Sequence, residues 1–110
     1  MAITSNVKQT IALTADGLAQ KYVGASATTI TKARIMNVYG QASAADAEIK
    51  IYNEADSSKT AKALVFHVKF SNADNHGQSF TIPGEGIYCN AGMYVDLTNC
   101  DFCTIIGTFT

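Results

Sequence analysis

The sequence predicts an all-β protein: a single-domain antiparallel β-sandwich of about eight or nine short strands, with a jelly roll as one strand order that fits. Three observations predict it. Val, Ile and Thr are abundant and Ile outnumbers Leu, which favours strands over helices. Apolar and polar residues alternate along several short segments. Gly, Asn, Asp and Ser separate these segments at the spacing typical of a sandwich or barrel.

Three segments show the clearest alternation: residues 47–52, 64–70 and 93–97. The second has one face of Leu64, Phe66, Val68 and Phe70 and an opposite face of His67 and Lys69. The third turns Met93, Val95 and Leu97 inward and Asp96 toward solvent. One apolar and one polar face are expected of strands in an antiparallel sheet.

The remaining strands follow in chain order, with residues 1–110 forming one domain. They are expected at residues 7–13, 19–23, 33–39, 79–82, 87–89 and 102–109. Residues 41–47 and 57–63 lack an apolar stripe, so we predict loops there, with at most one helical turn. Residues 1–10 form either an extended N-terminal arm or an ordinary first strand.

Composition limits the function classes. The 110 residues are 47% hydrophobic and 15% charged, which excludes a disordered chain. A formal net charge of -1 argues against nucleic acid as a partner, since a binder should carry a basic excess. No apolar run approaches the ~18 residues that a membrane span needs, and the first residues lack the features of a secretory signal. We therefore expect synthesis and folding in the cytoplasm.

The three cysteines, Cys89, Cys100 and Cys103, are an odd number and make a poor disulfide framework. Cys100 and Cys103 form a CxxC pattern. It lacks the second ligand pair of a zinc site and the flanking strand and helix of a redox site. We predict structural thiols in or beside strands. The sequence predicts neither a metal nor a cofactor.

No constellation of catalytic residues stands out, so we predict that the protein is not an enzyme. Asp96 and Glu85 would have to face each other across a cleft to act as a carboxylate pair. Ser79, His67 and Asp96 could be assembled as a triad, but no G-x-S-x-G motif frames any serine. Gly84 and Gly86 fit a tight turn better than a phosphate loop, because no helix follows them.

Four tyrosines could line a sugar-binding face, although we prefer half-buried positions around the core or in a subunit contact. Aromatic rings stack on sugars, so clustering on one solvent face would favour a carbohydrate-binding or adhesion module. Dispersal into the core and subunit contacts would count against it. These residues are Tyr39, Tyr52, Tyr88 and Tyr94.

The last third of the chain carries three motifs in a fixed order. A turn of the type PGxGI, here within residues 82–87, leads into a short strand. A hairpin of the type GLYVDL follows at residues 92–97, with Met93 in place of the expected Leu, and a β-branched strand at 104–109 completes the pattern. In these motifs the chain resembles small virion proteins of tailed bacteriophages. The closest match covers residues 80–110, and the cysteines lie outside the pattern.

This resemblance implies a non-enzymatic virion structural protein, with a capsid decoration (cement) protein as the first choice. Such proteins typically sit as trimers over junctions between major capsid subunits. The resemblance therefore implies the capsid surface as location, the major capsid protein as partner and a homotrimer as the favoured assembly. A tail, neck or fibre-associated component is the alternative within this class, and a hydrolytic enzyme ranks below the carbohydrate-binding module.

We place a subunit interface at Ile3, Val7 and Ile11.

Overall fold

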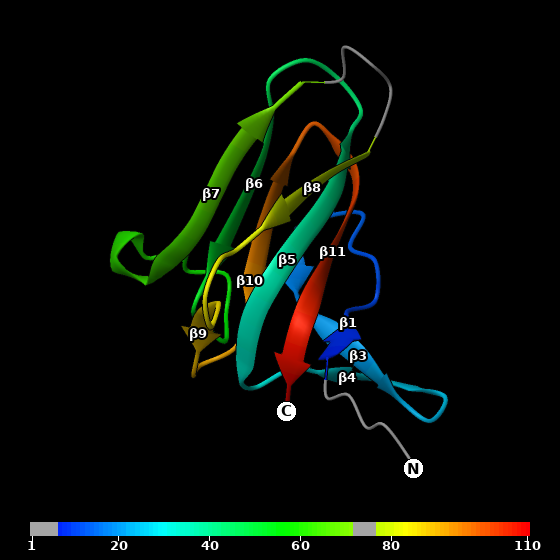
Figure 1. Cartoon of the computed structure of the whole chain (residues 1–110), viewed down its shortest axis with the longest axis vertical. Coiled ribbons are helices and arrows are strands. Elements are labelled where there is room, and N and C mark those ends of the chain that lie inside the picture. The colour runs from blue at the N-terminus through cyan, green and yellow to red at the C-terminus, as the bar shows by residue number, and fades with distance from the viewer. Residues whose placement is uncertain (1–6, 72–76) are drawn as a thin grey trace.

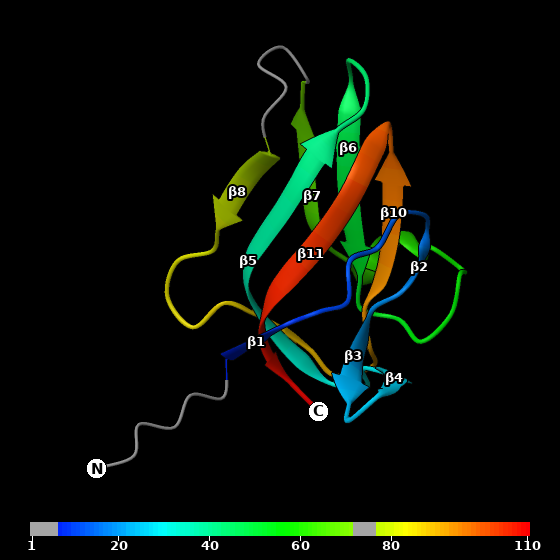
Figure 2. The same ribbon diagram turned by 90° about the vertical axis from the view of Figure 1, so that its right-hand side faces the viewer.

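The computed structural model describes residues 7–71 and 77–110, and these residues form a β-sandwich (Figure 1). Strands account for 61% of the described residues and helix for 3%. Figure 2 shows β5 and β11 side by side, with β6 and β10 behind them. The predicted all-β antiparallel sandwich is therefore confirmed. No helix in the described part of the chain is long and apolar enough to cross a bilayer.

The first sheet, called sheet 1, has the order β1-β11-β5-β8, and β9 also pairs with β5. All of its pairings are antiparallel. Two strands dominate it, because β5 and β11 are each ten residues long. Its strands are β1 (Val7–Gln9), β5 (Ala33–Ala42), β8 (Gly77–Thr81), β9 (Ile87–Cys89) and β11 (Cys100–Phe109).

The second sheet, called sheet 2, has the order β2-β10-β6-β7 and is also antiparallel. The chain passes from sheet 1 to sheet 2 between β5 and β6, and back again between β7 and β8. A single 3-10 turn, η1 (Ala61–Ala63), precedes β7. The strands are β2 (Gly17–Leu18), β6 (Ala47–Tyr52), β7 (Leu64–Phe70) and β10 (Tyr94–Thr98).

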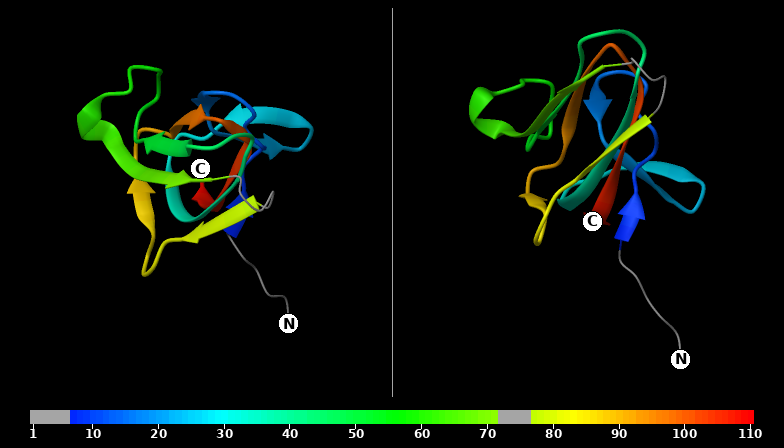
Figure 3. Two further views of the ribbon diagram at one scale, coloured as in Figure 1. Left: turned by 90° about the horizontal axis from the view of Figure 1, so that it is seen from above. Right: turned by 45° about the horizontal axis from the view of Figure 1, so that its top comes forward.

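A separate hairpin projects from the sandwich (Figure 3). It consists of β3 (Gln20–Val23) and β4 (Ser26–Thr29), joined by a turn in which Gly24 has φ 62°. Every residue of β4 is exposed, and Tyr22 and Val23 are 65% and 57% exposed. β3 lies within the predicted strand 19–23, but the second strand was not predicted, because Ser-Ala-Thr-Thr has no apolar alternation.

Facing side chains of the two sheets make the core. Most of the fully buried positions come from β5, β6, β10 and β11, and each buried aliphatic side chain contributes about 1.5–3 kcal/mol through the hydrophobic effect. In β6 and β10 the inward row is the apolar one, as the alternation predicted. The largest aliphatic residues with no exposed surface are Ile35, Val38, Ile49, Ile51, Val95 and Ile105.

Two strands end at positions that differ clearly from the prediction. The expected strand 7–13 stops at Gln9, after which the N–H of Thr10 donates to the Ile105 carbonyl and Leu13 forms a single bridge to Cys103. β5 continues through Ala42, into the region predicted as a loop, because β11 extends far enough to pair with it. The single helical turn allowed within 57–63 is present.

Leu64 was predicted to face the core, and this was wrong. Ile51 pairs with Phe66, but the next residue, Tyr52, pairs with Leu64, so Val65 is an extra residue in β7. Such a bulge reverses the side-chain alternation beyond it. Leu64 is therefore 37% exposed, whereas Val65 packs against the core.

Candidate docking face

The outer face of sheet 1 carries a shallow groove of about 560 Å³ with no charged side chain in its lining. Alternate residues of β11, namely Phe102, Thr104 and Ile106, form its floor together with Tyr39 of β5. The rings of Tyr39 and Phe102 lie 5.7 Å apart. The groove is therefore an aromatic and aliphatic surface with a small number of amide and hydroxyl groups around it.

The polar groups of the groove bond to one another. The Asn37 amide nitrogen donates to the hydroxyls of Ser79 at 2.8 Å and Thr81 at 3.0 Å. The Ser79 hydroxyl in turn donates to the Asn37 carbonyl at 3.1 Å. Because these residues occupy neighbouring positions on β5 and β8, the strand register itself aligns them. The network fixes the shape of the groove wall.

The Tyr39 side chain occupies the space that a side chain at Gly77 of the neighbouring strand β8 would fill. A Cβ on Gly77 would lie 2.0 Å from the Tyr39 hydroxyl oxygen and 2.3 Å from the ring carbon that bears it. The absence of a side chain at Gly77 thus lets the tyrosine ring extend across β8. The aromatic surface of the groove depends on this close approach.

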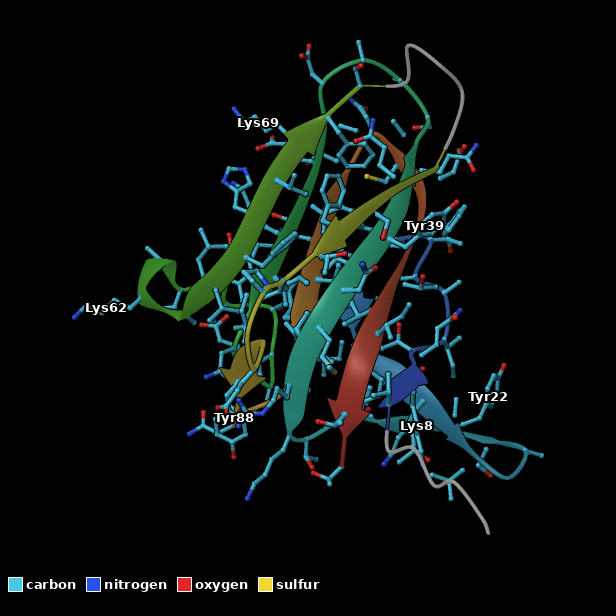
Figure 4. The ribbon with its side chains drawn as sticks, viewed as in Figure 1. Lys8, Tyr22, Tyr39, Lys62, Lys69 and Tyr88 are labelled. Carbon is cyan, nitrogen blue, oxygen red and sulfur yellow. The ribbon has the colours of Figure 1, made fainter. Side chains whose placement is uncertain are left out.

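A second depression, of about 600 Å³, lies at the end of sheet 1 where β5 and β11 reach Lys32 and Thr110. We call it the basic pocket, because Lys8, Lys32 and Arg34 line it. The Arg34 guanidinium lies 5.3 Å from the centre of the Tyr88 ring, a cation–π arrangement. Figure 4 shows Lys8 and Tyr88 at this end of the sandwich and Tyr39 farther along β5.

The outer face of sheet 2 has a different chemistry. Lys59 pairs with Asp16 at 3.3 Å and with Asp96 at 3.6 Å. His67 donates from Nε2 to the Glu48 carboxylate at 2.7 Å, and this hydrogen bond is the main cause that lowers the pKa of Glu48. Lys59 and His67 thus have carboxylate partners within the chain, whereas Lys50 and Lys69 on the same face form no salt bridge among the described residues.

The residues considered for catalysis do not converge. Ser79 lies on sheet 1 in the Asn37 network, whereas His67 and Asp96 lie on separate strands of sheet 2, with Lys50 between them in the strand register. Asp96 is paired with Lys59. Glu85 lies in the turn between β8 and β9, where its backbone carbonyl accepts from Arg34. Neither the carboxylate pair nor the triad is assembled.

The four tyrosines are dispersed. Tyr39 lines the groove on sheet 1, and Tyr88 lies against Arg34 in the basic pocket. Tyr52 is buried, and Tyr94 pairs with it across sheet 2. Dispersal is the arrangement that counts against an aromatic sugar platform.

The three cysteines are free thiols. Burial raises the pKa of Cys89 to about 11 and that of Cys103 to about 12, and it also raises the pKa of the half-buried Cys100. Thiols held in this neutral form are poor nucleophiles and poor metal ligands. Among the described residues, no group of three His, Cys, Asp or Glu side chains could hold a metal.

The three residues chosen as a subunit interface have different surroundings. Ile3 lies outside the described residues. Val7 begins β1 at the edge of sheet 1 and is 43% exposed. Ile11 is half-buried, with its N–H bonded to the Gln20 carbonyl. Residues 7–9 form an ordinary edge strand, and a role for these residues in assembly remains a prediction.

The sequence analysis missed the groove and the basic pocket, although β11 contained a signal. Its inward row includes Cys103, Ile105 and Phe109, yet its outward row also holds Phe102 and Ile106. A strand with apolar residues on both faces is typical of a sheet that is covered on both sides. The sequence did not indicate that Lys8 lies near Lys32 and Arg34, because Lys8 comes from β1 and the other two from β5 and the segment before it.

Comparison with known proteins gave no match: no family model, no curated protein and no solved structure is similar to this chain.

Proposed function

We propose that the chain is a non-enzymatic structural protein of a phage virion, and that it decorates the capsid by docking the outer face of sheet 1 on the major capsid protein. The resemblance of residues 80–110 to small virion proteins supports the class. We choose the outer face of sheet 1 as the docking face because it contains the groove. Its β11 floor has apolar side chains on the outer side as well as the inner side of the sandwich. A partner that covers this row gains hydrophobic burial.

The fold suits a role that depends on contact. The sandwich presents a fixed surface, because register and the Asn37 network hold the groove in one shape. A preorganised surface binds with a smaller entropic cost than a flexible one. Many copies on a lattice would also convert weak single contacts into strong total attachment. We place the protein on the capsid surface after synthesis in the host cytoplasm.

Binding to capsids that lack the chain tests the docking face. Ile106→Glu puts a charge into the groove and should abolish co-sedimentation with capsids purified from a phage deleted for this chain. Leu64→Glu is the matched control, because it also replaces an exposed aliphatic residue by Glu, but on sheet 2. Both variants should keep the wild-type circular dichroism spectrum. Equal binding by the two variants would contradict the proposed face.

The favoured assembly is a homotrimer, which light scattering on the purified chain measures directly. A trimer mass would support decoration at a symmetric capsid junction. A monomer that binds capsids would remove preassembly from the proposal. Immunogold labelling of virions separates capsid decoration from a tail, neck or fibre position, since label confined to the tail would overturn the capsid assignment.

A further inference from the structure

The groove and the basic pocket belong to one continuous surface. On β11, Phe102, Thr104 and Ile106 line the groove, and Thr108, the next residue of the same row, lines the basic pocket. Thr108 pairs with Val7 on one side and Arg34 on the other, and Arg34 pairs with Tyr88. An uncharged region and a basic region therefore follow one another along a single strand.

The charges of the basic pocket lack a partner carboxylate. Within residues 7–71 and 77–110, Lys8, Lys32 and Arg34 form no salt bridge, whereas Lys59 on the other sheet forms two. The chain as a whole has a formal net charge of -1, so three neighbouring cations are a local excess. Even counting a carboxylate at Thr110, positive charges outnumber negative ones there.

Arg34 is oriented for a bond to an incoming group. Its guanidinium lies over the Tyr88 ring, and its Nη1 donates to the Glu85 carbonyl at 3.3 Å. That bond uses one of the five N–H donors of the guanidinium. The fixed plane suits a carboxylate, which guanidinium groups bind with two parallel hydrogen bonds.

We infer that the two regions together bind an extended protein segment that carries acidic side chains beside apolar ones. This inference rests on the proposed function and names the chemistry of the partner at the same face. Thr108 and Ile106 are two residues apart, about 7 Å along a strand. An extended partner would thus place its acidic and apolar side chains at alternate positions. A nucleic acid fits less well, because its backbone needs basic groups along its whole track, and the groove has none.

Two synthetic peptides test the inference by chemical-shift titration of the labelled, full-length chain. One has glutamates at two alternate positions followed by leucine and phenylalanine at the next two alternate positions. The other has lysines in place of the glutamates. We expect the acidic peptide to shift the resonances of Arg34, Thr108 and Ile106, and to bind about tenfold more tightly than the basic one. Higher ionic strength should remove most of that difference.

Charge reversal provides the matched variants. The triple variant K8E/K32E/R34E should lose the preference for the acidic peptide. The control K21E/K62E/K69E makes the same change in net charge at lysines outside the pocket and should keep the preference. Equal affinity for the two peptides, or an unchanged preference in the first variant, would overturn the inference. So would full competition by inorganic phosphate or single-stranded DNA, which would indicate a general anion site.

The capsid assay separates this inference from the proposed function. If Ile106→Glu abolishes capsid binding and K8E/K32E/R34E leaves it unchanged, the proposed function stands and the acidic partner is wrong. If the acidic peptide binds and capsids do not, the proposed function fails and the peptide chemistry of the face stands. Loss of capsid binding in both variants, and in neither control, supports both.

Discussion

The outer faces of the two sheets differ in chemistry, although both are built from antiparallel strands. On sheet 2, Lys59 and His67 bond to carboxylates within the chain. On sheet 1, the outward row of β11 is apolar at Phe102 and Ile106, and the cations beside it form no salt bridge among the described residues. On sheet 2, Lys59 and His67 are thus paired with carboxylates of the chain, although Lys50 and Lys69 form no salt bridge among the described residues. On sheet 1, partly exposed apolar side chains lie beside these cations, which is the chemistry on which the proposed docking rests.

The inward side chains of β11 should contribute far more to the free energy of unfolding than the outward ones. This difference between the two sides of β11 is the largest effect that we expect. Ile105→Ala removes a side chain with no exposed surface and should lower the free energy of unfolding by about 4 kcal/mol through lost burial and a cavity. Ile106→Ala, the adjacent residue on the outer face, should cost about 1 kcal/mol because its side chain already contacts water. Urea unfolding measures both. Similar losses would show that the groove side is part of the folding core.

Substitution of Gly107 should have the second largest effect on the free energy of unfolding. This glycine lies beside a register shift in the β5–β11 pair. A Cβ at this position would lie 2.0 Å from the Arg34 carbonyl oxygen, so Gly107→Ala should displace backbone and cost about 3 kcal/mol. Gly24→Ala in the hairpin is the control. It has a positive φ but meets nothing within 4 Å, and should cost about 1 kcal/mol. A small loss at Gly107 would mean that the two strands can separate locally.

The buried thiols predict a loss of stability at alkaline pH. Since burial raises the pKa of Cys89 and Cys103 from 9.0 to about 11 and about 12, the folded state keeps protons that the unfolded chain releases. This contribution is complete below pH 9 and is lost as pH rises toward 12. Urea unfolding at several pH values should show a steeper alkaline decline for wild type than for the Cys89→Ala/Cys103→Ala variant. Parallel curves would contradict burial of the two thiols.

The hydrogen bond between His67 and Glu48 on sheet 2 has the smallest expected effect on stability. His67 donates to Glu48 and lowers the pKa of its carboxyl below 4.5, so this contribution is present above that pH and is lost as pH falls through the lowered value. Both side chains contact water, so global stability should change little in His67→Ala. An NMR titration should show the Glu48 pKa rising in that variant. No change would mean that the hydrogen bond is absent in solution.

Sequence reasoning could predict most strands but only fragments of the docking face. Alternation identified β6, β7 and β10 because their polar residues face water. It failed at Leu64, where one extra residue in β7 reverses the faces. Tyr39 was singled out as aromatic, yet its position across Gly77 depends on a strand that lies far away in the sequence. Arg34, Lys8 and Lys32 formed no motif, because antiparallel pairing alone brings β1 and β5 to opposite sides of β11.

The sequence by itself determined the fold class, the inward rows of the main strands and the structural nature of the cysteines. Each of these follows from local alternation, residue type or the lack of a second ligand pair. Only the tertiary structure decided which outer face carries paired charges and which carries the apolar groove with cations beside it. The physical reason is that a face is built from side chains on several strands, so its charge balance depends on strand order and register. Those two features arise from long-range pairing.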